Sequence, residues 1–304
     1  MEKPKSFIGL DMGGTRIKAL AFKDDGTQLA EEIVPTLDDG NRAWLEGVRE
    51  LTRRMINRCP PPARLGLAAP GLVSADRRSI AFMPGRLEGL EGLNWKQSLG
   101  LDTPIEVLND AQAALLGEIW LGAARGARNV FMLTLGTGVG GAAMVDGRVL
   151  RGHIGRAGHL GHVSLDANGA PDVARTPGSL EDAIGECSVQ VRTHGKFSST
   201  QDLVARFRDG DPEAAAIWLR SVRVLAAALA SFVNILDPEL IVIGGGIADA
   251  NEALFEPLEA GLNEFEWRPG GARVRVVKAA LGRNSGAAGA AYGAKLAAES
   301  EANM

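Results

Sequence analysis

One local pattern occurs twice in this sequence, and the repetition limits the fold more than any other feature. The pattern is an apolar strand, a glycine turn and a second strand. Its first copy lies within residues 7–18 and turns at Gly13–Gly14–Thr15, and its second is TLGTGVGG at 134–141, between the apolar runs 130–133 and 142–145. Glycine has no Cβ, so the backbone of such a turn can approach a ligand closely. Its successive N–H groups can then form an anion site.

Either hairpin alone is also typical of an ordinary turn with bulges. Two of them, one early and one in the middle of the chain, instead indicate two similar domains whose hairpins grip the phosphates of one nucleotide. Neither is a Walker A loop, which ends in Gly-Lys-Ser/Thr and precedes a helix. Neither is the dinucleotide fingerprint, because a strand follows where that motif has a helix.

Composition and charge exclude several classes of protein. The 304 residues are 45% hydrophobic and 23% charged, which is ordinary for a globular chain with room for two cores. The net charge of −4 argues against nucleic acid as a partner. We expect no membrane segment, because no apolar run reaches the roughly 20 residues that a membrane helix needs, and no signal-peptide pattern. Cys59 and Cys187 make no disulfide framework, which favours the reducing cytoplasm.

Hydrophobic periodicity predicts a mixed α/β chain in which strand pairs, helix, strand and helix follow one another twice. Residues 41–58 have apolar side chains at helical spacing and end at three prolines. The irregular segment 76–93 is long, and loops of that length are more often functional than structural. The other expected elements are three strands within 6–35, strands at 64–69, 104–108, 240–243 and 274–277, helices at 110–121, 212–236 and 285–298, and a loop-rich region at 152–177.

Seven short motifs are together specific enough to identify a family. They are DMGGT at 11–15, APG at 69–71, LNDAQAALLGE at 108–118, TLGTGVGG at 134–141, GRAGHLGH at 155–162, GSLED at 178–182 and DPELIVIGGG at 237–246. In this order they resemble the bacterial sugar kinases of the ROK family (repressor, open reading frame, kinase), and the resemblance covers nearly the whole chain.

The resemblance implies the actin-like, hexokinase-type fold. This fold has two ribonuclease H-like α/β domains with an active-site cleft between them. The first domain would span residues 1–120 and be joined by a C-terminal helix at about 285–304, and the second would span 121–284. Relatives of this kind form homodimers, which the resemblance implies here as well.

Phosphoryl transfer to a hydroxyl needs clamps for the phosphates, Mg²⁺ and a base near the attacking oxygen. Asp110 is the candidate general base, because it stands at the end of a strand and the start of a helix, where open sheets bind ligands. The alternative is that Asp110 only caps the helix. Asp11 resembles the family's acidic residue near Mg²⁺, and its alternative is a buried turn residue. By the resemblance, the residues that bind ATP are Asp11, Gly13, Gly14, Thr15, Lys18, Thr134, Gly136, Thr137, Gly138, Gly244, Gly245 and Gly246.

A sugar needs convergent polar groups in a pocket. The residues at or beside the family's hydroxyl-binding positions are Asn94, Asn109, Asp110, His159, His162 and Glu181. Glu181 has an alternative interpretation, a solvated glutamate at a helix start, where the helix dipole favours it. Gly244–Gly245–Gly246 resembles the adenosine-side loop, but a plain helix-entry turn is its alternative.

The sequence departs from the family at a metal site. Many members carry Cys-x-Cys-Gly-x-x-Gly-Cys before the sugar-binding glutamate and bind structural zinc with an upstream histidine. Here Asp172, Ala174 and Ser179 take the cysteine positions, and His162 takes the histidine position. One histidine without thiolates is not a closed tetrahedral site, so we expect no structural zinc. A cluster of His153, His159 and His162 is a weaker alternative, because its spacing suits a loop poorly.

The second departure is His159, where the sugar kinases have a glutamate that accepts hydrogen bonds from the sugar. A neutral imidazole offers one donor and one acceptor, whereas a carboxylate only accepts. We therefore expect altered recognition of a hydroxyl more than loss of kinase activity. The loop 84–93 aligns with the family's sugar-side region and is expected to reshape the pocket.

The leading hypothesis is a cytoplasmic ATP-dependent sugar kinase that uses Mg²⁺. The first alternative is a non-catalytic sugar sensor or regulator on the same fold; the first strand begins at about Ser6, which leaves no room before it for the helix-turn-helix of such regulators. The second is another phosphotransferase of the superfamily, such as a carboxylate kinase, and Glu181 with the Asn109–Asp110 pair favours a polyol instead.

Overall fold

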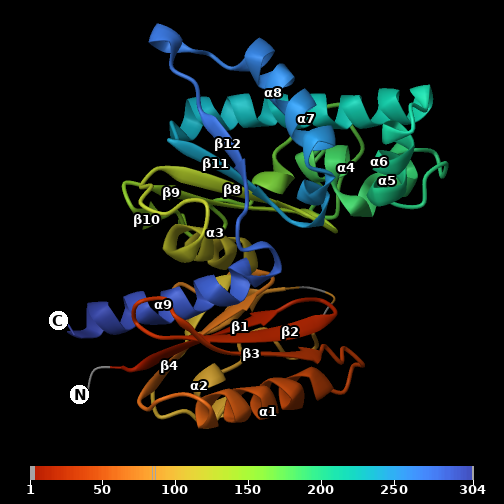
Figure 1. Cartoon of the computed structure of the whole chain (residues 1–304). Helices are drawn as coiled ribbons and strands as arrows, with labels where there is room; N and C mark the ends of the chain where they lie inside the picture. Colours follow the sequence, from red (N-terminus) through yellow and green to blue (C-terminus); the bar gives the residue numbers. More distant parts are fainter. Residues whose placement is uncertain (1–3, 84, 86, 303–304) are drawn as a thin grey trace. The chain divides into compact units, whose positions relative to one another are not determined.

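The computed structural model describes residues 4–83, 85 and 87–302 (Figure 1). Pro84 and Arg86, which belong to the predicted loop 84–93, lie outside the described residues, as do the last two residues of the predicted C-terminal helix. The chain divides into two compact units, each with its own sheet and core. Unit 1 consists of Met1–Gly126, Arg151–Ala157 and Ala280–Met304, and unit 2 of Ala127–Leu150 and Gly158–Ala279.

The sheet of unit 1 has the strand order β3-β2-β1-β4-β7. β1, β2 and β3 pair antiparallel through two tight turns, whereas β1, β4 and β7 pair parallel. The carboxyl ends of the three parallel strands therefore meet at one edge of the sheet. The strands are β1 (Ser6–Met12), β2 (Arg16–Phe22), β3 (Gln28–Pro35), β4 (Ala63–Ala69) and β7 (Glu106–Asn109).

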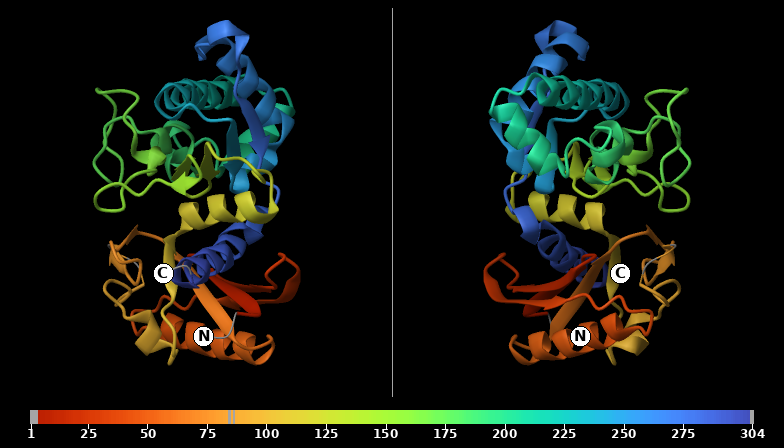
Figure 2. Two further views of the ribbon diagram at one scale, coloured as in Figure 1. Left: turned by 90° about the vertical axis from the view of Figure 1, so that its left-hand side faces the viewer. Right: turned by 90° about the vertical axis from the view of Figure 1, so that its right-hand side faces the viewer.

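The two faces of this sheet carry different helices, as the side views in Figure 2 show. α1 (Ala43–Asn57) covers one face, and α9 (Ser285–Ala302) covers the other, with α3 (Asp110–Leu121) packed on α9. Side chains of a strand alternate between faces, so Ile8 and Leu10 point to the α1 core and Phe7 to the α9 core.

α9 lies on the sheet at backbone contact because the facing positions are glycines. A Cβ placed on Gly66 would stand 1.9 Å from the carbonyl oxygen of Ala290, and one on Gly9 would stand 1.8 Å from that of Ala287. A Cβ on Gly117 of α3 would stand 2.3 Å from the carbonyl oxygen of Ser285. The small residues of α9 therefore pack against glycines that lie far away in the sequence.

The predicted irregular segment 76–93 contains short elements that no periodicity could indicate. β5 (Leu72–Val73) and β6 (Ile80–Phe82) form a small antiparallel pair, and α2 (Trp95–Ser98) follows. Elements of two to four residues are shorter than the repeat on which sequence patterns depend.

The sheet of unit 2 repeats the topology of the first, with the order β10-β9-β8-β11-β12. β8 pairs antiparallel with β9 and parallel with β11, so the tip of the second glycine hairpin and the glycines after β11 lie at the same edge. The strands are β8 (Val130–Leu135), β9 (Val139–Val145), β10 (Arg148–Val149), β11 (Leu240–Gly244) and β12 (Arg275–Lys278).

α7 (Pro212–Leu236) is the central helix of unit 2 and packs with α8 (Glu252–Phe265) over one face of the sheet (Figure 1). By length and composition it is apolar enough to span a membrane, although the sequence suggested no such segment. Its inner face, with Trp218, Leu225 and Phe232, is buried in the core, and half of its most apolar window is buried. α7 is therefore accounted for as a core helix. The other helices are α4 (Leu180–Ile184), α5 (Val189–Arg192), α6 (Thr200–Arg208) and α8 (Glu252–Phe265), with short 3₁₀ turns η1 (Leu160–His162), η2 (Glu186–Ser188), η3 (Gly246–Ala250), η4 (Pro269–Gly271) and η5 (Gly282–Asn284).

Candidate active site

Two carboxylates lie at the edge of unit 1 where the parallel strands end. Asp11 is half-buried near the end of β1, and Asp110 is exposed at the start of α3, directly after β7. Burial raises the pKa of Asp11 to about 7; the Asp110 carboxylate adds to the rise and the Lys18 ammonium opposes it. The fold thus brings Asp11 and Asp110 into electrostatic contact, although they are far apart in sequence.

Asn109, not Asp110, is the cap of α3. Its side-chain oxygen accepts hydrogen bonds from the N–H groups of Ala111 at 3.0 Å and Gln112 at 3.4 Å, and its Nδ2 donates to Gly71 O at 3.1 Å. Asp110 Oδ1 also accepts from Ala111 N at 2.8 Å. Because Asn109 already caps the helix, a capping function alone does not account for the exposed carboxylate at position 110.

The first glycine hairpin is closed by its own backbone. Gly13 N donates to Arg16 O at 3.0 Å, and the Thr36 hydroxyl donates to Gly13 O at 2.8 Å. Gly14 and Thr15 are exposed at the tip. The hairpin is therefore tied to Thr36, the residue after β3, while Gly14 and Thr15 face solvent.

Lys18 follows this hairpin, and its ammonium is held by the segment that leads into α9. It donates to Arg283 O at 2.9 Å and to Asn284 Oδ1 at 2.6 Å. Gly286, in the first turn of α9, lies so close to Asp11 that a Cβ there would be 2.5 Å from Oδ2. Asn284 and Gly286 were not among the predicted site residues, because only the fold brings the start of α9 to β1.

The second glycine hairpin is supported from behind by η2. Gly136 O accepts from Glu186 N at 3.0 Å, and Thr137 O accepts from Cys187 N at 2.8 Å. Thr137 itself is exposed, and a Cβ on Gly136 would meet no described atom within 4 Å. The tip therefore combines a fixed backbone with open space on its outer side.

The three glycines at the end of β11, Gly244–Gly246, have different surroundings. Gly244 is the buried last residue of β11 and pairs with Thr134 of β8. Gly245 has φ +86°, and a Cβ there would lie 2.2 Å from Leu135 O, so the turn itself requires glycine. Gly246 is exposed, and a Cβ on it would meet no described atom within 4 Å. The turn interpretation thus accounts for Gly245, whereas Gly246 leaves room beside the hairpin.

Glu181 is buried rather than solvated, which contradicts the alternative interpretation of a surface helix start. It lies in the first turn of α4, behind the cap Ser179. Its Oε2 accepts a hydrogen bond from Val139 N at 2.9 Å and sits beside Gly138, where a Cβ would be 2.3 Å away. The carboxylate is therefore held against the second hairpin.

The histidines of the 155–162 motif differ in their surroundings. His162 Nδ1 lies 2.8 Å from Oδ2 of the buried Asp172. Ligand atoms of His162, Asp172 and Glu181 lie within 4.8 Å of one another. His159 is half-buried at the start of η1, and neither it nor His153 belongs to this group. Asp172 as the partner of His162 was missed, because the sequence marked it only as a lost cysteine position.

Asn94 caps α2 in unit 1. Its side-chain oxygen accepts from Gln97 N at 3.0 Å, and the residue is exposed. The structure gives Asn94 a local structural function, and its predicted contact with sugar stays a prediction.

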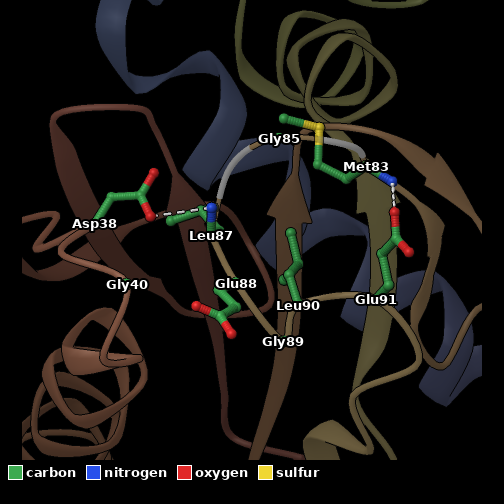
Figure 3. A pocket seen from close by; sticks show the side chains of 9 residues that line it. All are labelled: Asp38, Gly40, Met83, Gly85, Leu87, Glu88, Gly89, Leu90 and Glu91. Atoms are coloured by element: carbon green, nitrogen blue, oxygen red, sulfur yellow. Dashed lines mark hydrogen bonds between the residues drawn. The ribbon is translucent and has the colours of Figure 1, made fainter.

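A cavity of about 570 Å³ in unit 1 is lined in part by Gly85 and residues 87–91 (Figure 3). Figure 3 shows the Asp38 carboxylate turned toward Leu87 N, at 3.1 Å, and the Glu91 carboxylate toward Met83 N, at 2.5 Å. Each carboxylate thus fixes a backbone N–H group beside this cavity, Asp38 that of Leu87 and Glu91 that of Met83. The expected influence of the predicted loop 84–93 on a sugar pocket stays a prediction.

These features define an α/β protein of the two-domain actin-like class, as predicted from the sequence. The chain belongs to the ROK family, whose model matches residues 7–297.

Relatives of known name are similar over most of their length. A glucokinase of Halalkalibacterium halodurans is 30% identical, with 94% of both chains covered, and an N-acetyl-D-glucosamine kinase of Yersinia pseudotuberculosis is 30% identical, with 94% of this chain and 98% of that one covered.

Solved structures agree with the family. The ROK hexokinase of Thermus thermophilus superposes with a TM-score of 0.82 at 32% identity, covering 97% of this chain and 99% of that one. A Streptomyces griseus ROK glucokinase, solved with glucose and AMPPNP, gives 0.75 at 26% identity, covering 96% and 99%. A ROK transcriptional regulator gives 0.81 at 24% identity, covering 96% of this chain and 78% of that one, and shows the fold alone.

Proposed function

We propose that this protein is an ATP-dependent sugar kinase, which transfers the γ-phosphate of ATP to a hydroxyl of a hexose or hexose derivative with Asp110 as general base. The observation that carries the proposal is the pair Asp110 and Asp11: one exposed carboxylate at a helix start, beside a second whose pKa is raised to about 7. A base and a metal-side carboxylate at the carboxyl ends of parallel strands are what phosphoryl transfer to a hydroxyl requires.

ATP is assigned to the glycine segments of both units. In unit 1 the hairpin Gly13–Thr15 and Lys18 are proposed to bind its phosphates. In unit 2 we assign the phosphate side to Thr134 and the tip Gly136–Gly138, and the nucleoside side to Gly244–Gly246, where Gly246 leaves open space. Support comes from the similar kinase that was solved with AMPPNP.

Asp11 is the proposed ligand on the Mg²⁺ side. Its partly buried carboxylate fits this ion, because Mg²⁺ prefers oxygen ligands and is usually held by one or two carboxylates, the substrate phosphates and water. When bound, the ion would offset the charge of the phosphates. The Lys18 ammonium opposes the rise in the pKa of Asp11 and so favours its ionised form.

The sugar is assigned to Asn94, Asn109, His159, His162 and Glu181, with Asp110 at the reacting hydroxyl. Two similar relatives are named for glucose and N-acetylglucosamine, which favours a hexose or its derivative. His159 introduces a hydrogen-bond donor where a glutamate would only accept. We therefore expect a substrate range that differs from that of a standard glucokinase.

The test is ADP release with Mg·ATP against hexoses, N-acetylated amino sugars and ketoses. Asp110→Asn should lower the sugar-dependent kcat by about 10²–10⁴-fold, as expected for loss of a general base. Asp102→Asn, an exposed aspartate before β7, is the matched control and should keep its activity. Sugar-dependent turnover that persists in Asp110→Asn would refute the assignment of the base.

A sensor that binds sugar without turnover is the second candidate, because His159 replaces a glutamate and a regulator shares the fold. It predicts a sugar-dependent rise in melting temperature with no ADP release. In that case His159→Glu is the first variant to restore turnover.

We also propose a cytoplasmic homodimer. Both cysteines are free thiols, as a reducing compartment favours. Sedimentation velocity measures the oligomeric state directly.

A further inference from the structure

The loop between η1 and α4 is organised around one buried carboxylate, that of Asp172. The side chain is fully buried. Its Oδ1 accepts from Ala174 N at 2.9 Å and Thr176 N at 2.8 Å, while Oδ2 faces His162 Nδ1 at 2.8 Å. Both carboxylate oxygens therefore take part in contacts with groups of the chain.

The ionised form of Asp172 is favoured by these contacts. Burial alone raises the pKa of Asp172, but hydrogen bonds from His162, Thr176 N and the Ser179 hydroxyl outweigh burial and lower it. An ionised carboxylate only accepts hydrogen bonds. Since Asp172 accepts, His162 Nδ1 has to carry the proton that lies between them.

The residues at this place do not fit the zinc site of the family. Ala174 has no atom in its side chain that could bind a metal. The Ser179 hydroxyl caps α4 by accepting a hydrogen bond from Asp182 N at 3.2 Å. Glu181 Oε2 accepts from Val139 N, and the two Asp172 oxygens face Ala174 N, Thr176 N and His162 Nδ1. A closed zinc site needs four ligands, preferably thiolate and imidazole, and this set supplies one imidazole and two carboxylates.

We propose that Asp172 positions His162 in place of a metal and, by taking its Nδ1–H, makes Nε2 a hydrogen-bond acceptor for a hydroxyl of the sugar. A metal on Nδ1 would leave the proton on Nε2, which would then donate. The carboxylate leaves the lone pair on Nε2 of the neutral ring. Nε2 of His162 therefore accepts a hydrogen bond, whereas Nε2 of a metal-bound ring would donate one.

This change is the counterpart of the substitution at His159. There an acceptor is replaced by a group that can donate, and at His162 a donor is replaced by an acceptor. The two positions are three residues apart at the two ends of η1. His159 and His162 together therefore exchange the positions of one hydrogen-bond donor and one acceptor, and neither is lost. This inference rests on the proposed sugar-binding function of the site.

The first test needs no activity and no variant of Asp172. Nitrogen-15 NMR of the four histidine rings reports which nitrogen carries the proton, and a His162→Gln variant assigns the signals. We expect the Nδ1–H tautomer for neutral His162. Metal analysis of protein purified without chelator should give far less than one zinc per chain. The Nε2–H tautomer, or one zinc per chain, would overturn the proposal even if the protein is a kinase.

The second test separates positioning from general stability. With D-glucose as the probe, Asp172→Asn should raise the KM for the sugar by about 10–100-fold, as is typical when the partner of an oriented histidine is lost. The KM for ATP should change less than about twofold. Asp166→Asn is the control in the same loop, because Asp166 is exposed and makes a turn contact of its own, to Asn168 N at 2.9 Å. An unchanged sugar KM in Asp172→Asn overturns the proposal.

The third test measures the polarity of Nε2 directly. Monodeoxy glucoses and the matching deoxyfluoro sugars are compared in the wild-type protein, because fluorine can accept weakly but cannot donate. At the hydroxyl that contacts His162 both analogues should lose affinity equally, and Asp172→Asn should abolish that loss. A fluoro sugar that binds well at the position where the deoxy sugar fails would contradict an acceptor. If glucose is not turned over at all, the proposed activity fails while the tautomer and metal measurements still decide this inference.

Discussion

Replacing Glu118 with glutamine should destabilise unit 1 by about 3–6 kcal/mol, because one buried carboxylate joins three segments of its chain. Glu118 lies in α3 and is fully buried. Oε2 accepts from Ala123 N at 2.8 Å and Ala280 N at 2.9 Å; Oε1 accepts from Leu281 N at 2.9 Å and the Ser285 hydroxyl at 2.8 Å. The end of α3 and the start of α9 are thus tied together.

The magnitude follows from the chemistry of the amide. Glutamine keeps one oxygen, which can accept two of the four hydrogen bonds. Its NH₂ group must face the other donors whichever way it is turned, so two hydrogen bonds are lost. Hydrogen bonds to charged groups are worth about 1.5–3 kcal/mol each, and an unsatisfied buried donor costs a comparable amount.

The assay is urea unfolding followed by fluorescence. Trp120 is a local reporter, since it stacks on Tyr292 of α9 with ring centroids 5.2 Å apart. With a slope of about 2–3 kcal/mol/M, the midpoint should fall by about 1 M or more. Glu46→Gln on α1 is the control, because Glu46 pairs with Arg49 at the surface and should matter by less than about 1 kcal/mol. Equal midpoints for the two variants would refute the reasoning.

Three further predictions concern packing and pH. Gly66→Ala should lower the melting temperature strongly or prevent folding, because its Cβ would meet the Ala290 carbonyl at 1.9 Å, whereas Gly47→Ala on α1 meets nothing described and should be tolerated. Since the pKa of Asp11 is about 7, this group is protonated in the folded protein below pH 7. The KM for Mg·ATP should therefore rise as pH falls from 8 to 6, and an equal pH dependence in Asp11→Asn would contradict this assignment. The folded state also binds more protons than the unfolded state between pH 3.8 and about 7, so the free energy of unfolding should fall as pH rises across this range.

Local patterns in the sequence were sufficient for much of the fold. The predicted helices 110–121 and 212–236 agree with the bounds of α3 and α7, because each has a strong cap and α7 has a long apolar face. The glycine motifs identified the family, and the family implied the actin-like fold. α8 was not predicted, and the predicted helix 285–298 extends in the structure to Ala302.

The sequence by itself determined which residue types are present and where glycine turns interrupt the strands, because these depend on neighbours in the chain. Only the tertiary structure decided which polar groups meet. Asp172 with His162 and Glu118 with the start of α9 are contacts between residues 10 to 167 positions apart. No periodicity encodes such a pair, because it forms only when separate elements pack and their buried polar groups must find partners away from water.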